Sequence, residues 1–335
     1  MRSSQTDEVL AGLRAVANGS LSAATNMPPA MYHDDEILTL ERDRVFARDW
    51  VSPGLAAEIP KPGDRLTWSI ADRPVFCVRG ADGLIRTFSN VCRHRMMTLV
   101  DGDGTGLRIT CPYHAWTYDL EGHLVGTNHM EATDGFDEAD VCLPEVRTEV
   151  WQGWIYSTLN SDALPVAELL APMEEFVARY GVPDYVPVHR QDETWGGNWK
   201  FLVENFMEGY HLPVAHRSTL GTWMPMDSVV FPDRRHEGFT YQMFEKDENA
   251  QYGRGPSGQR PAGRALAVHH LYADGVPITH VHPGPRPPLV PVATPGRRQS
   301  GRPAVRDRPG PGGPRLAGRP RGVDCRDGRV LHCGV

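Results

Sequence analysis

The chain carries two short cysteine–histidine pairs, Cys92-Arg-His94 and Cys111-Pro-Tyr-His114. The first pair has one spacer residue, the second has two, and sixteen residues separate His94 from Cys111. Each pair is short enough for one tight loop to direct a thiolate and an imidazole to the same place. Two such loops side by side can supply two sulfur and two nitrogen ligands. The sequence therefore predicts a metal centre held by these four residues.

Two kinds of centre take two cysteines and two histidines, a tetrahedral zinc ion and a Rieske [2Fe–2S] cluster. Zinc fingers commonly place two to four residues between paired ligands, whereas the first pair here has only one. In a Rieske cluster two cysteines hold one iron and two histidines hold the other, so each loop would give one ligand to each iron. The spacing favours the cluster, and a structural zinc module remains the alternative.

Composition excludes several other classes of protein. With 335 residues, 40% of them hydrophobic, the chain can bury a substantial core, and its formal net charge of −7 makes nucleic acid an unfavourable partner. No run approaches the roughly 18 apolar residues of a membrane span, so no membrane association is expected. Residues 1–20 lack the apolar centre of a signal peptide, so a cytoplasmic location is expected.

The hydrophobic pattern changes along the chain. Residues 6–17 and 33–48 have helical spacing and predict an N-terminal helical segment. Short strands separated by turns follow between residues 50 and 160, which predicts a small antiparallel β domain that carries the metal loops. Strands are expected at 66–70, 74–78, 85–88 and 151–159, with a turn at Gly80–Gly83 and a hairpin at 118–124. Helical spacing returns at 165–181, with a kink expected at Pro172, and again from Asn198 to about Tyr210.

A second group of chemical interest lies between Asn198 and His216. Glu208 and His211 are three residues apart, so on a helix they would share a face. Pro213 would then interrupt the helix and let His216 approach the same point. Two histidines and a carboxylate from elsewhere in the chain form the common ligand set of non-haem Fe(II) enzymes. Because fourteen histidines are scattered through the chain, this pattern is weak evidence alone.

Both groups together resemble the α (large) subunits of Rieske-type non-haem iron ring-hydroxylating oxygenases. The resemblance rests on C-x-H-x16-C-x-x-H with Pro112, Tyr113 and Trp116, on the segment 198–216, and on their order and separation. It covers about residues 30–282. It implies that Cys92, His94, Cys111 and His114 bind a [2Fe–2S] Rieske cluster and that His211 and His216 bind a mononuclear Fe(II). It further implies that Glu208 links the iron site to a cluster histidine of the neighbouring subunit in a homotrimer.

The fold implied by this resemblance is α+β, an antiparallel β Rieske [2Fe–2S] domain inserted in a helix-and-antiparallel-sheet catalytic domain of helix-grip (START-like) type. The expected division is an N-terminal helical segment at 1–49 that packs with the catalytic domain, the Rieske domain at 50–160, and a partial mononuclear-iron domain at 161–283. Residues 284–335 are expected to form a separate tail.

The implied function is that of a terminal oxygenase, a monooxygenase or a dioxygenase. Electrons would pass from NAD(P)H through a reductase or ferredoxin partner to the cluster and then to the iron. Oxygen from O2 would be inserted into an aromatic or quaternary-ammonium small molecule. Glutamate rather than aspartate at position 208 resembles the branch that acts on choline or carnitine. The alternative is a Rieske electron-transfer protein, or an inactive oxygenase that lacks the third iron ligand.

Residues 286–335 depart from the rest of the chain in composition. They contain eleven Arg, no Lys, three Asp and no Glu, nine Pro and nine Gly, and no Phe, Trp or Tyr. Their formal charge is +8, whereas the 24 Lys and Arg and 39 Asp and Glu before them give −15. Such a composition cannot bury enough apolar surface to offset its conformational entropy. We expect either a disordered tail or, as the favoured explanation, a shifted reading frame near Pro283.

Overall fold

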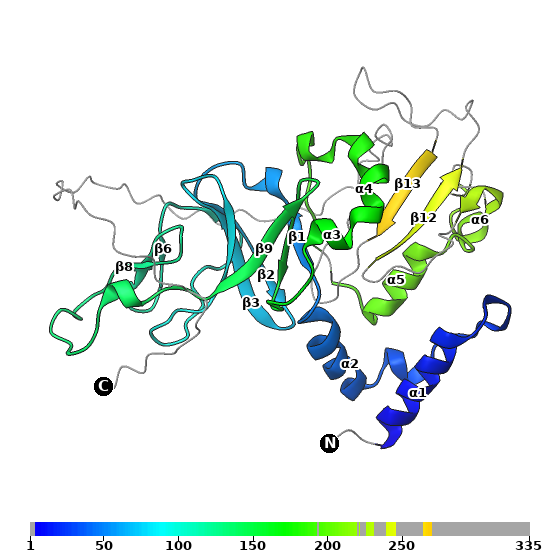
Figure 1. The fold of residues 1–335 in the computed structure, drawn as a ribbon, viewed down its shortest axis with the longest axis horizontal. Helices are drawn as coiled ribbons and strands as arrows, with labels where there is room; N and C mark the ends of the chain where they lie inside the picture. The colour runs from blue at the N-terminus through cyan, green and yellow to red at the C-terminus, as the bar shows by residue number, and fades with distance from the viewer. Residues whose placement is uncertain are drawn as a thin grey trace, which may run out of the picture.

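The computed structural model describes residues 4–192, 194–219, 221, 226–230, 239–245 and 264–269 (Figure 1). The expected tail at 284–335 lies outside these residues, as does most of the segment that follows Gly221. The α+β class expected from the sequence is confirmed, because antiparallel sheets and several helices make up the described chain.

The N-terminal segment is helical, as its apolar spacing predicts. It contains α1 (Ser4–Asn18), two short 3-10 turns and α2 (Asp35–Glu41). Asp34 caps α2, because its carboxylate accepts hydrogen bonds from the backbone N–H groups of Glu36 and Ile37. The sequence did not predict that α2 continues as a π-helical turn, η3 (Arg42–Phe46).

The main sheet has seven antiparallel strands in the order β1-β10-β9-β4-β3-β2-β5. Their bounds are β1 Val51–Leu55, β2 Asp64–Ile70, β3 Arg73–Arg79, β4 Ile85–Ser89, β5 Gly104–Thr105, β9 Glu145–Trp151 and β10 Trp154–Thr158. The strands expected near residues 66–70, 74–78 and 85–88 are confirmed. The single strand expected at 151–159 is instead divided between two strands. Gln152 and Gly153, both at positive φ, form a turn that joins the end of β9 to β10 as a hairpin.

A smaller sheet carries the metal loops at one end of the molecule. Its strands β6 (Ile109–Thr110), β7 (Thr117–Tyr118) and β8 (Leu124–Gly126) are antiparallel, in the order β6-β7-β8. The expected hairpin at 118–124 corresponds to β7 and β8. A cluster of buried side chains joins this sheet to β3 and β4 of the main sheet. It consists of Phe76, Val78, Phe88, Cys92, Leu99, Val100, Ile109, Cys111, Trp116, Tyr118, Leu120, Leu124, Val141 and Leu143.

Helices and a third sheet follow the main sheet. The expected kink is present, because α3 (Val166–Leu169) ends before Leu170 and α4 (Ala171–Val177) has Pro172 in its first turn. Two 3-10 turns, η6 (Ala178–Tyr180) and η7 (Val182–Asp184), meet at Gly181, whose φ of +61° is the left-handed conformation that glycine adopts readily. A short strand β11 (Val229–Val230) pairs with β12 (Thr240–Glu245), which pairs with β13 (Arg264–His269).

Helix α5 (Trp199–Met207) lies beside β12 and β13 and is followed by the single-turn helix α6 (Leu212–Ala215). The prediction that this helix continues to about Tyr210 is wrong. Helix α5 ends at Met207, and Glu208 is extended, with φ −124° and ψ 147°. Pro213 does not interrupt a helix either, because it lies in the first turn of α6, where no N–H partner is needed. None of the described helices is long and apolar enough to cross a membrane.

Candidate metal centres

The two cysteine–histidine pairs lie in loops of nearly the same conformation. In the first loop the N–H of Met96 donates to the carbonyl of Cys92, and the N–H of Cys92 donates to the carbonyl of Met97. In the second loop Ala115 donates to Cys111, and Cys111 donates to Trp116. Met96 and Ala115, each four residues after its cysteine, both have positive φ, 55° and 58°. The different spacers, C-x-H and C-x-x-H, therefore occur within matching loops.

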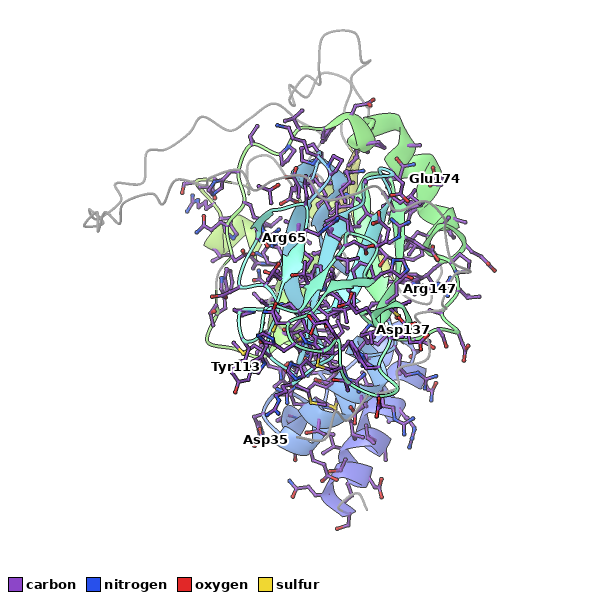
Figure 2. All side chains as sticks on the ribbon, turned by 90° about the vertical axis from the view of Figure 1, so that its left-hand side faces the viewer. Asp35, Arg65, Tyr113, Asp137, Arg147 and Glu174 are labelled. Atoms are coloured by element: carbon purple, nitrogen blue, oxygen red, sulfur yellow. The ribbon has the colours of Figure 1, made fainter. Side chains whose placement is uncertain are left out.

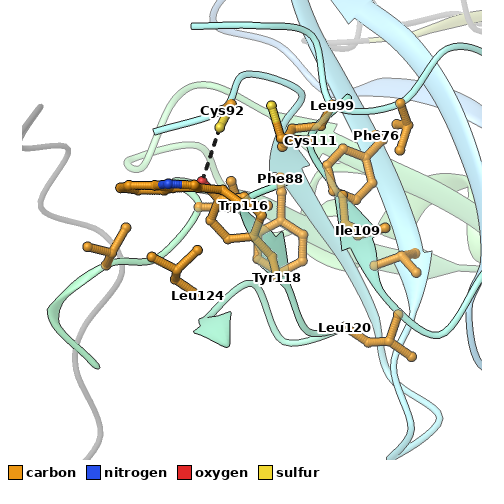
Figure 3. Close-up of a cluster of buried hydrophobic side chains, with 14 residues drawn as sticks. Phe76, Phe88, Cys92, Leu99, Ile109, Cys111, Trp116, Tyr118, Leu120 and Leu124 are labelled. Atoms are coloured by element: carbon orange, nitrogen blue, oxygen red, sulfur yellow. Dashed lines mark hydrogen bonds between the residues drawn. The ribbon is translucent and has the colours of Figure 1, made fainter. Parts of the chain in front are cut away.

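Both cysteines are buried within the cluster that joins the two sheets. Cys92 is 1% exposed and Cys111 is 3% exposed, and both are free thiols. Figure 3 shows them side by side at one end of that cluster. Burial raises the pKa of the Cys92 thiol, so a positive charge in the site is needed to keep it as a thiolate at neutral pH. A bound metal centre would supply that charge.

The histidine rings complete the donor set. The rings of His94 and His114 lie 4.7 Å apart between centroids. The Nδ1 atoms of both rings are buried, and neither has a hydrogen-bond partner among the described residues. Burial is the main cause of a lowered pKa for His94, with further lowering by His114 and Arg95, so its ring is neutral and able to act as a ligand. Two buried thiols and two unpaired imidazole nitrogens fit a Cys2His2 metal centre.

Aromatic side chains hold the first histidine ring in place. The indole of Trp116 stacks on the imidazole of His94, with centroids 4.7 Å apart and an interplanar angle of 10°. Phe136, which lies in a loop more than twenty residues after His114, packs against Trp116, with ring centroids 5.6 Å apart. The sequence analysis singles out Trp116, which is next to the second pair. It does not predict Phe136, because no spacing pattern connects Phe136 to the ligands.

Tyr118 contacts the first cysteine directly. Its hydroxyl lies 3.5 Å from Sγ of Cys92 (Figure 3). The same oxygen accepts a hydrogen bond of 3.1 Å from the backbone N–H of Arg93. With that N–H on the phenol oxygen, the phenol O–H is free to donate to the sulfur. Tyr118 is completely buried, and burial raises its pKa, so the hydroxyl keeps its proton at all physiological pH values.

The tips of both loops are exposed and partly apolar. Exposed side chains beside the ligands include Met96, Met97, Leu107 and Tyr113. Figure 2, which views the molecule from the end that carries these loops, places Tyr113 at the edge of the view. The histidine side of the site therefore lies close to the molecular surface, whereas the cysteine side is in the core.

The second candidate site lies after α5. His211 and His216 flank the single turn of α6 as its N-cap and C-cap residues, and their rings are 5.3 Å apart between centroids. The structure thus brings together the two imidazoles that the sequence paired, on either side of a bend. No group of three or more His, Cys, Asp or Glu that could hold a single metal ion is found among the described residues, so no third ligand is assigned.

Glu208 contacts His211 by a route other than the shared helical face that the sequence suggested. That expectation is wrong, because Glu208 lies beyond the end of α5 and is followed by a turn in which the N–H of Leu212 donates to the carbonyl of Gly209. One carboxylate oxygen of Glu208 accepts from Nδ1 of His211. The other accepts from the backbone N–H groups of Tyr210 and His211. A turn stabilised by its own carboxylate therefore replaces the helix, and Nε2 of His211 is left for another partner.

Two protein families match this chain. Residues 49–144 match the Rieske [2Fe-2S] domain, and residues 182–276 match the catalytic domain of the ring-hydroxylating alpha subunit. The first match contains all four residues of the cysteine–histidine loops, and the second contains Glu208, His211 and His216.

Individual relatives agree with these matches. The chain is 31% identical over 219 residues to the glycine betaine monooxygenase oxygenase subunit of Pseudomonas aeruginosa, covering 65% of this chain and 51% of the relative. It is 33% identical over 196 residues to the carnitine monooxygenase oxygenase subunit of Escherichia coli K12, covering 58% and 52%. The chain therefore spans about half the length of the curated relatives it matches.

Solved structures share the fold. The quaternary ammonium Rieske monooxygenase CntA in complex with an inhibitor has a TM-score of 0.64 at 24% identity, covering 76% of this chain and 73% of that one. Naphthalene 1,2-dioxygenase from Rhodococcus sp. has a TM-score of 0.67 at 22% identity, covering 82% and 72%. A Rieske cluster and a mononuclear iron are the centres that the two matched domains carry. Because a Rieske [2Fe–2S] domain and a ring-hydroxylating catalytic domain follow each other in one chain, the protein belongs to the family of Rieske-type ring-hydroxylating oxygenase α subunits.

Proposed function

We propose that the chain acts as the terminal oxygenase component of a Rieske monooxygenase or dioxygenase. The observation that carries this proposal is the presence of two separate donor sets in one chain. One consists of two buried thiols with two unpaired imidazole nitrogens, and the other of two imidazoles around α6. A protein that only transfers electrons needs the first set and has no use for the second.

In this proposal Cys92 and Cys111 hold one iron of the [2Fe–2S] cluster, and His94 and His114 hold the other through Nδ1. The bound cluster supplies single electrons at a potential raised by its histidine ligands. The chain itself contributes a dry cysteine side, the ring of Trp116 against His94, and the hydroxyl of Tyr118 near Cys92. Hydrogen bonds and burial of this kind tune the potential of such centres.

His211 and His216 would hold the mononuclear Fe(II); no third ligand is assigned among the described residues. The bound metal supplies the open positions at which O2 and substrate react. Glu208 fixes the tautomer of His211, since the carboxylate accepts from Nδ1 and so presents Nε2 to the metal. The Glu208 side chain is 42% exposed, and carboxylate lone pairs remain on it, so a histidine of another subunit can also reach it.

A homotrimer follows as part of the proposal. Figure 1 shows the strands beside the metal loops, β6 and β8, at one end of the described chain, and α5 and α6 towards the other. Electron transfer within one subunit would have to cross that length. The exposed apolar loop tip around Met96 and Tyr113 suits contact with a second copy, next to its Glu208. Inter-subunit electron transfer is described for a solved quaternary ammonium Rieske monooxygenase, which supports this arrangement.

The substrate we propose is a small quaternary ammonium compound. Two relatives at 31% and 33% identity are oxygenase subunits of glycine betaine and carnitine monooxygenases. An aromatic substrate is the alternative, since a naphthalene dioxygenase shares the fold. A reductase or ferredoxin would deliver the electrons. The cytoplasmic location expected from the sequence stays a prediction.

Metal content and a single-turnover reaction test this proposal. We expect three irons and two acid-labile sulfides per chain. We expect Glu208→Gln to keep both centres loaded but to slow oxidation of the reduced cluster about 10- to 100-fold when substrate and O2 are added. Glu204→Gln is the matched control, because Glu204 is an exposed carboxylate on the same segment whose partner is Tyr32.

The outcomes separate the alternatives. Two irons and two sulfides per chain, with no effect of His211→Ala on metal content, would indicate the electron-transfer protein. A colourless protein with one zinc per chain would contradict the cluster itself. Wild-type cluster oxidation in Glu208→Gln would leave the iron site in place but remove Glu208 from the electron path.

A further inference from the structure

A buried ion pair joins the N-terminal helical segment to the helix that leads to the iron site. Lys200, in the first turn of α5, donates from Nζ to both carboxylate oxygens of Glu41, at 2.7 and 2.9 Å. The two side chains are only 7% and 9% exposed. Glu41 is the last residue of α2, so the pair connects residues 159 positions apart in sequence.

The neighbouring residue Trp199 shares the same carboxylate. Its indole N–H donates to Glu41 Oε2 at 2.8 Å, and its ring meets the ring of Phe46 edge-on at 5.1 Å. Trp199 also packs against the buried cluster formed by Phe46, Val51, Ile70, Val75 and Val146. Most of that cluster belongs to the main sheet. Glu41 therefore holds two consecutive residues of α5, one of which is packed on the sheet of the Rieske domain.

The π-helical turn η3 explains how two residues of one short segment, Glu41 and Phe46, both contact Trp199. In an α-helix each residue turns the chain by about 100°, so residues five apart point about 140° away from each other. In a π-helical turn the N–H of residue i+5 donates to the carbonyl of residue i, as Ala47 donates to Arg42 here, so residues five apart lie on the same side of the helix. Glu41 and Phe46 are five apart, and both contact Trp199. A regular α-helix could not present both side chains to the same indole.

Stabilisation of the fold does not by itself explain why the Glu41–Lys200 ion pair is buried here. Burying two charges costs about as much as their attraction returns, and apolar replacements of similar size are often equally stable. What a hydrogen-bonded ion pair adds is direction, since Lys200 and Trp199 both bind the same carboxylate and together restrict the orientation of α5. The nine residues of α5 span roughly 13 Å, so a tilt of about 5° at the first turn moves the far end by about 1 Å. Directly after the far end comes Glu208, which holds His211.

We propose that Glu41 is a positioning residue for the mononuclear-iron site. Through Lys200 and Trp199 it sets the direction of α5, and through α5 it sets the places of Glu208 and His211. This inference rests on the proposed function, because it needs His211 and His216 to bind a metal. The N-terminal segment would then affect metal binding indirectly, without contacting the metal.

The test replaces both charges at once, with Glu41→Leu and Lys200→Met in one variant. No buried charge is then left without a partner, so the free energy of unfolding should stay close to that of the wild type, as judged by the urea midpoint. Binding of Co(II) alone, followed by its visible absorption bands, reports on the histidine site. We expect the dissociation constant for Co(II) to rise at least tenfold in the double variant, while the cluster absorption per chain does not change.

Controls and contrary outcomes are defined by the same measurement. Tyr32→Phe removes an exposed hydrogen bond of 2.6 Å between the same two segments and should leave Co(II) binding unchanged. His211→Ala should abolish it. A double variant that is stable and binds Co(II) like the wild type would overturn the positioning role. A wild type that binds Co(II) no better than His211→Ala would overturn the proposed iron site, and this inference with it.

A second variant covers the case in which the double replacement does not fold. Glu41→Gln keeps the size of the side chain and one acceptor but loses the second charge-assisted hydrogen bond. We expect a rise of about threefold or more in the Co(II) dissociation constant. An unchanged constant in that variant would equally count against the inference.

Discussion

The phenol oxygen of Tyr118 lies 3.5 Å from Sγ of Cys92 and accepts a hydrogen bond from the N–H of Arg93. A hydroxyl that donates to a cluster sulfur stabilises the more electron-rich reduced state over the oxidised state. Removing it should therefore lower the reduction potential of the cluster.

We expect Tyr118→Phe to lower that potential by about 60 mV. This value corresponds to about 1.4 kcal/mol of differential stabilisation for one electron, within the usual range for one hydrogen bond. Protein-film voltammetry or a dye-coupled titration followed by electron paramagnetic resonance measures the shift. Tyr113→Phe is the matched control, since Tyr113 is an exposed tyrosine within the Cys111–His114 loop. Equal potentials in the two variants would show that Tyr118 only fills space.

Replacing a histidine ligand tests the ligand assignment. We expect His114→Cys, where the cluster survives, to lower the potential by more than about 200 mV, because all-cysteine [2Fe–2S] centres lie well below Rieske centres. The rhombic signal of the reduced cluster should change as well. His123→Ala removes an exposed histidine of the same domain, paired with Asp119, and should change neither property. An unaltered potential in His114→Cys would exclude His114 as a ligand.

Gly122 tests how tightly the metal-loop sheet packs on the main sheet. Its φ is +89°, and a Cβ placed there would be 2.6 Å from a ring carbon of the buried Phe88. We expect Gly122→Ala to lower the free energy of unfolding by about 2–5 kcal/mol, from backbone strain and overpacking together.

Gly83 separates these two causes. Its φ of +82° is nearly the same, but nothing lies within 4 Å of a Cβ placed there. Gly83→Ala should therefore cost only the strain, about 1–2 kcal/mol. Urea denaturation followed by circular dichroism measures both variants. Equal losses would mean that Phe88 moves aside freely and that this contact contributes little.

Cys77 gives a prediction about pH. Burial raises the pKa of its thiol to about 12, from an ordinary value near 9. In the folded protein only about one Cys77 in 10⁴ is a thiolate at pH 8, so iodoacetamide should leave it unmodified until the chain unfolds. Mass spectrometry of labelled peptides, with and without urea, checks this. Rapid labelling of Cys77 in the folded protein at pH 8 would contradict the burial.

The same shift has a consequence for stability. Because the folded-state pKa is above the unfolded one, the unfolded chain loses the Cys77 proton first as the pH rises. The contribution of Cys77 is therefore complete below about pH 9 and is lost between pH 9 and pH 12. Cys77→Val removes the titrating group but keeps an apolar side chain. Between pH 8 and pH 10.5 its urea midpoint should decrease less than that of the wild type.

Several features were predictable from the sequence because their causes are local. The cysteine–histidine spacing defines a ligand set within a few residues, and the antiparallel strands β2 to β4 follow from alternating side chains and a turn at Gly80–Gly83. The break before Pro172 follows from the missing N–H of proline. The prediction that the helix continues through Glu208 was wrong, also for a local reason. Helical spacing could not show that the Glu208 carboxylate accepts hydrogen bonds from the backbone N–H groups of the turn that follows it.

Only the tertiary structure decided which of these local elements act together. The orphaned Nδ1 atoms of His94 and His114 become one site because two loops sixteen residues apart pack side by side on a shared core. The contact of Glu41 with Lys200 and Trp199 depends on a π-helical turn and on packing between segments 159 residues apart. Spacing along the chain specifies which side chains can bind a metal. Packing between distant segments specifies where those side chains point, since direction at that distance is set by contacts that no local pattern encodes.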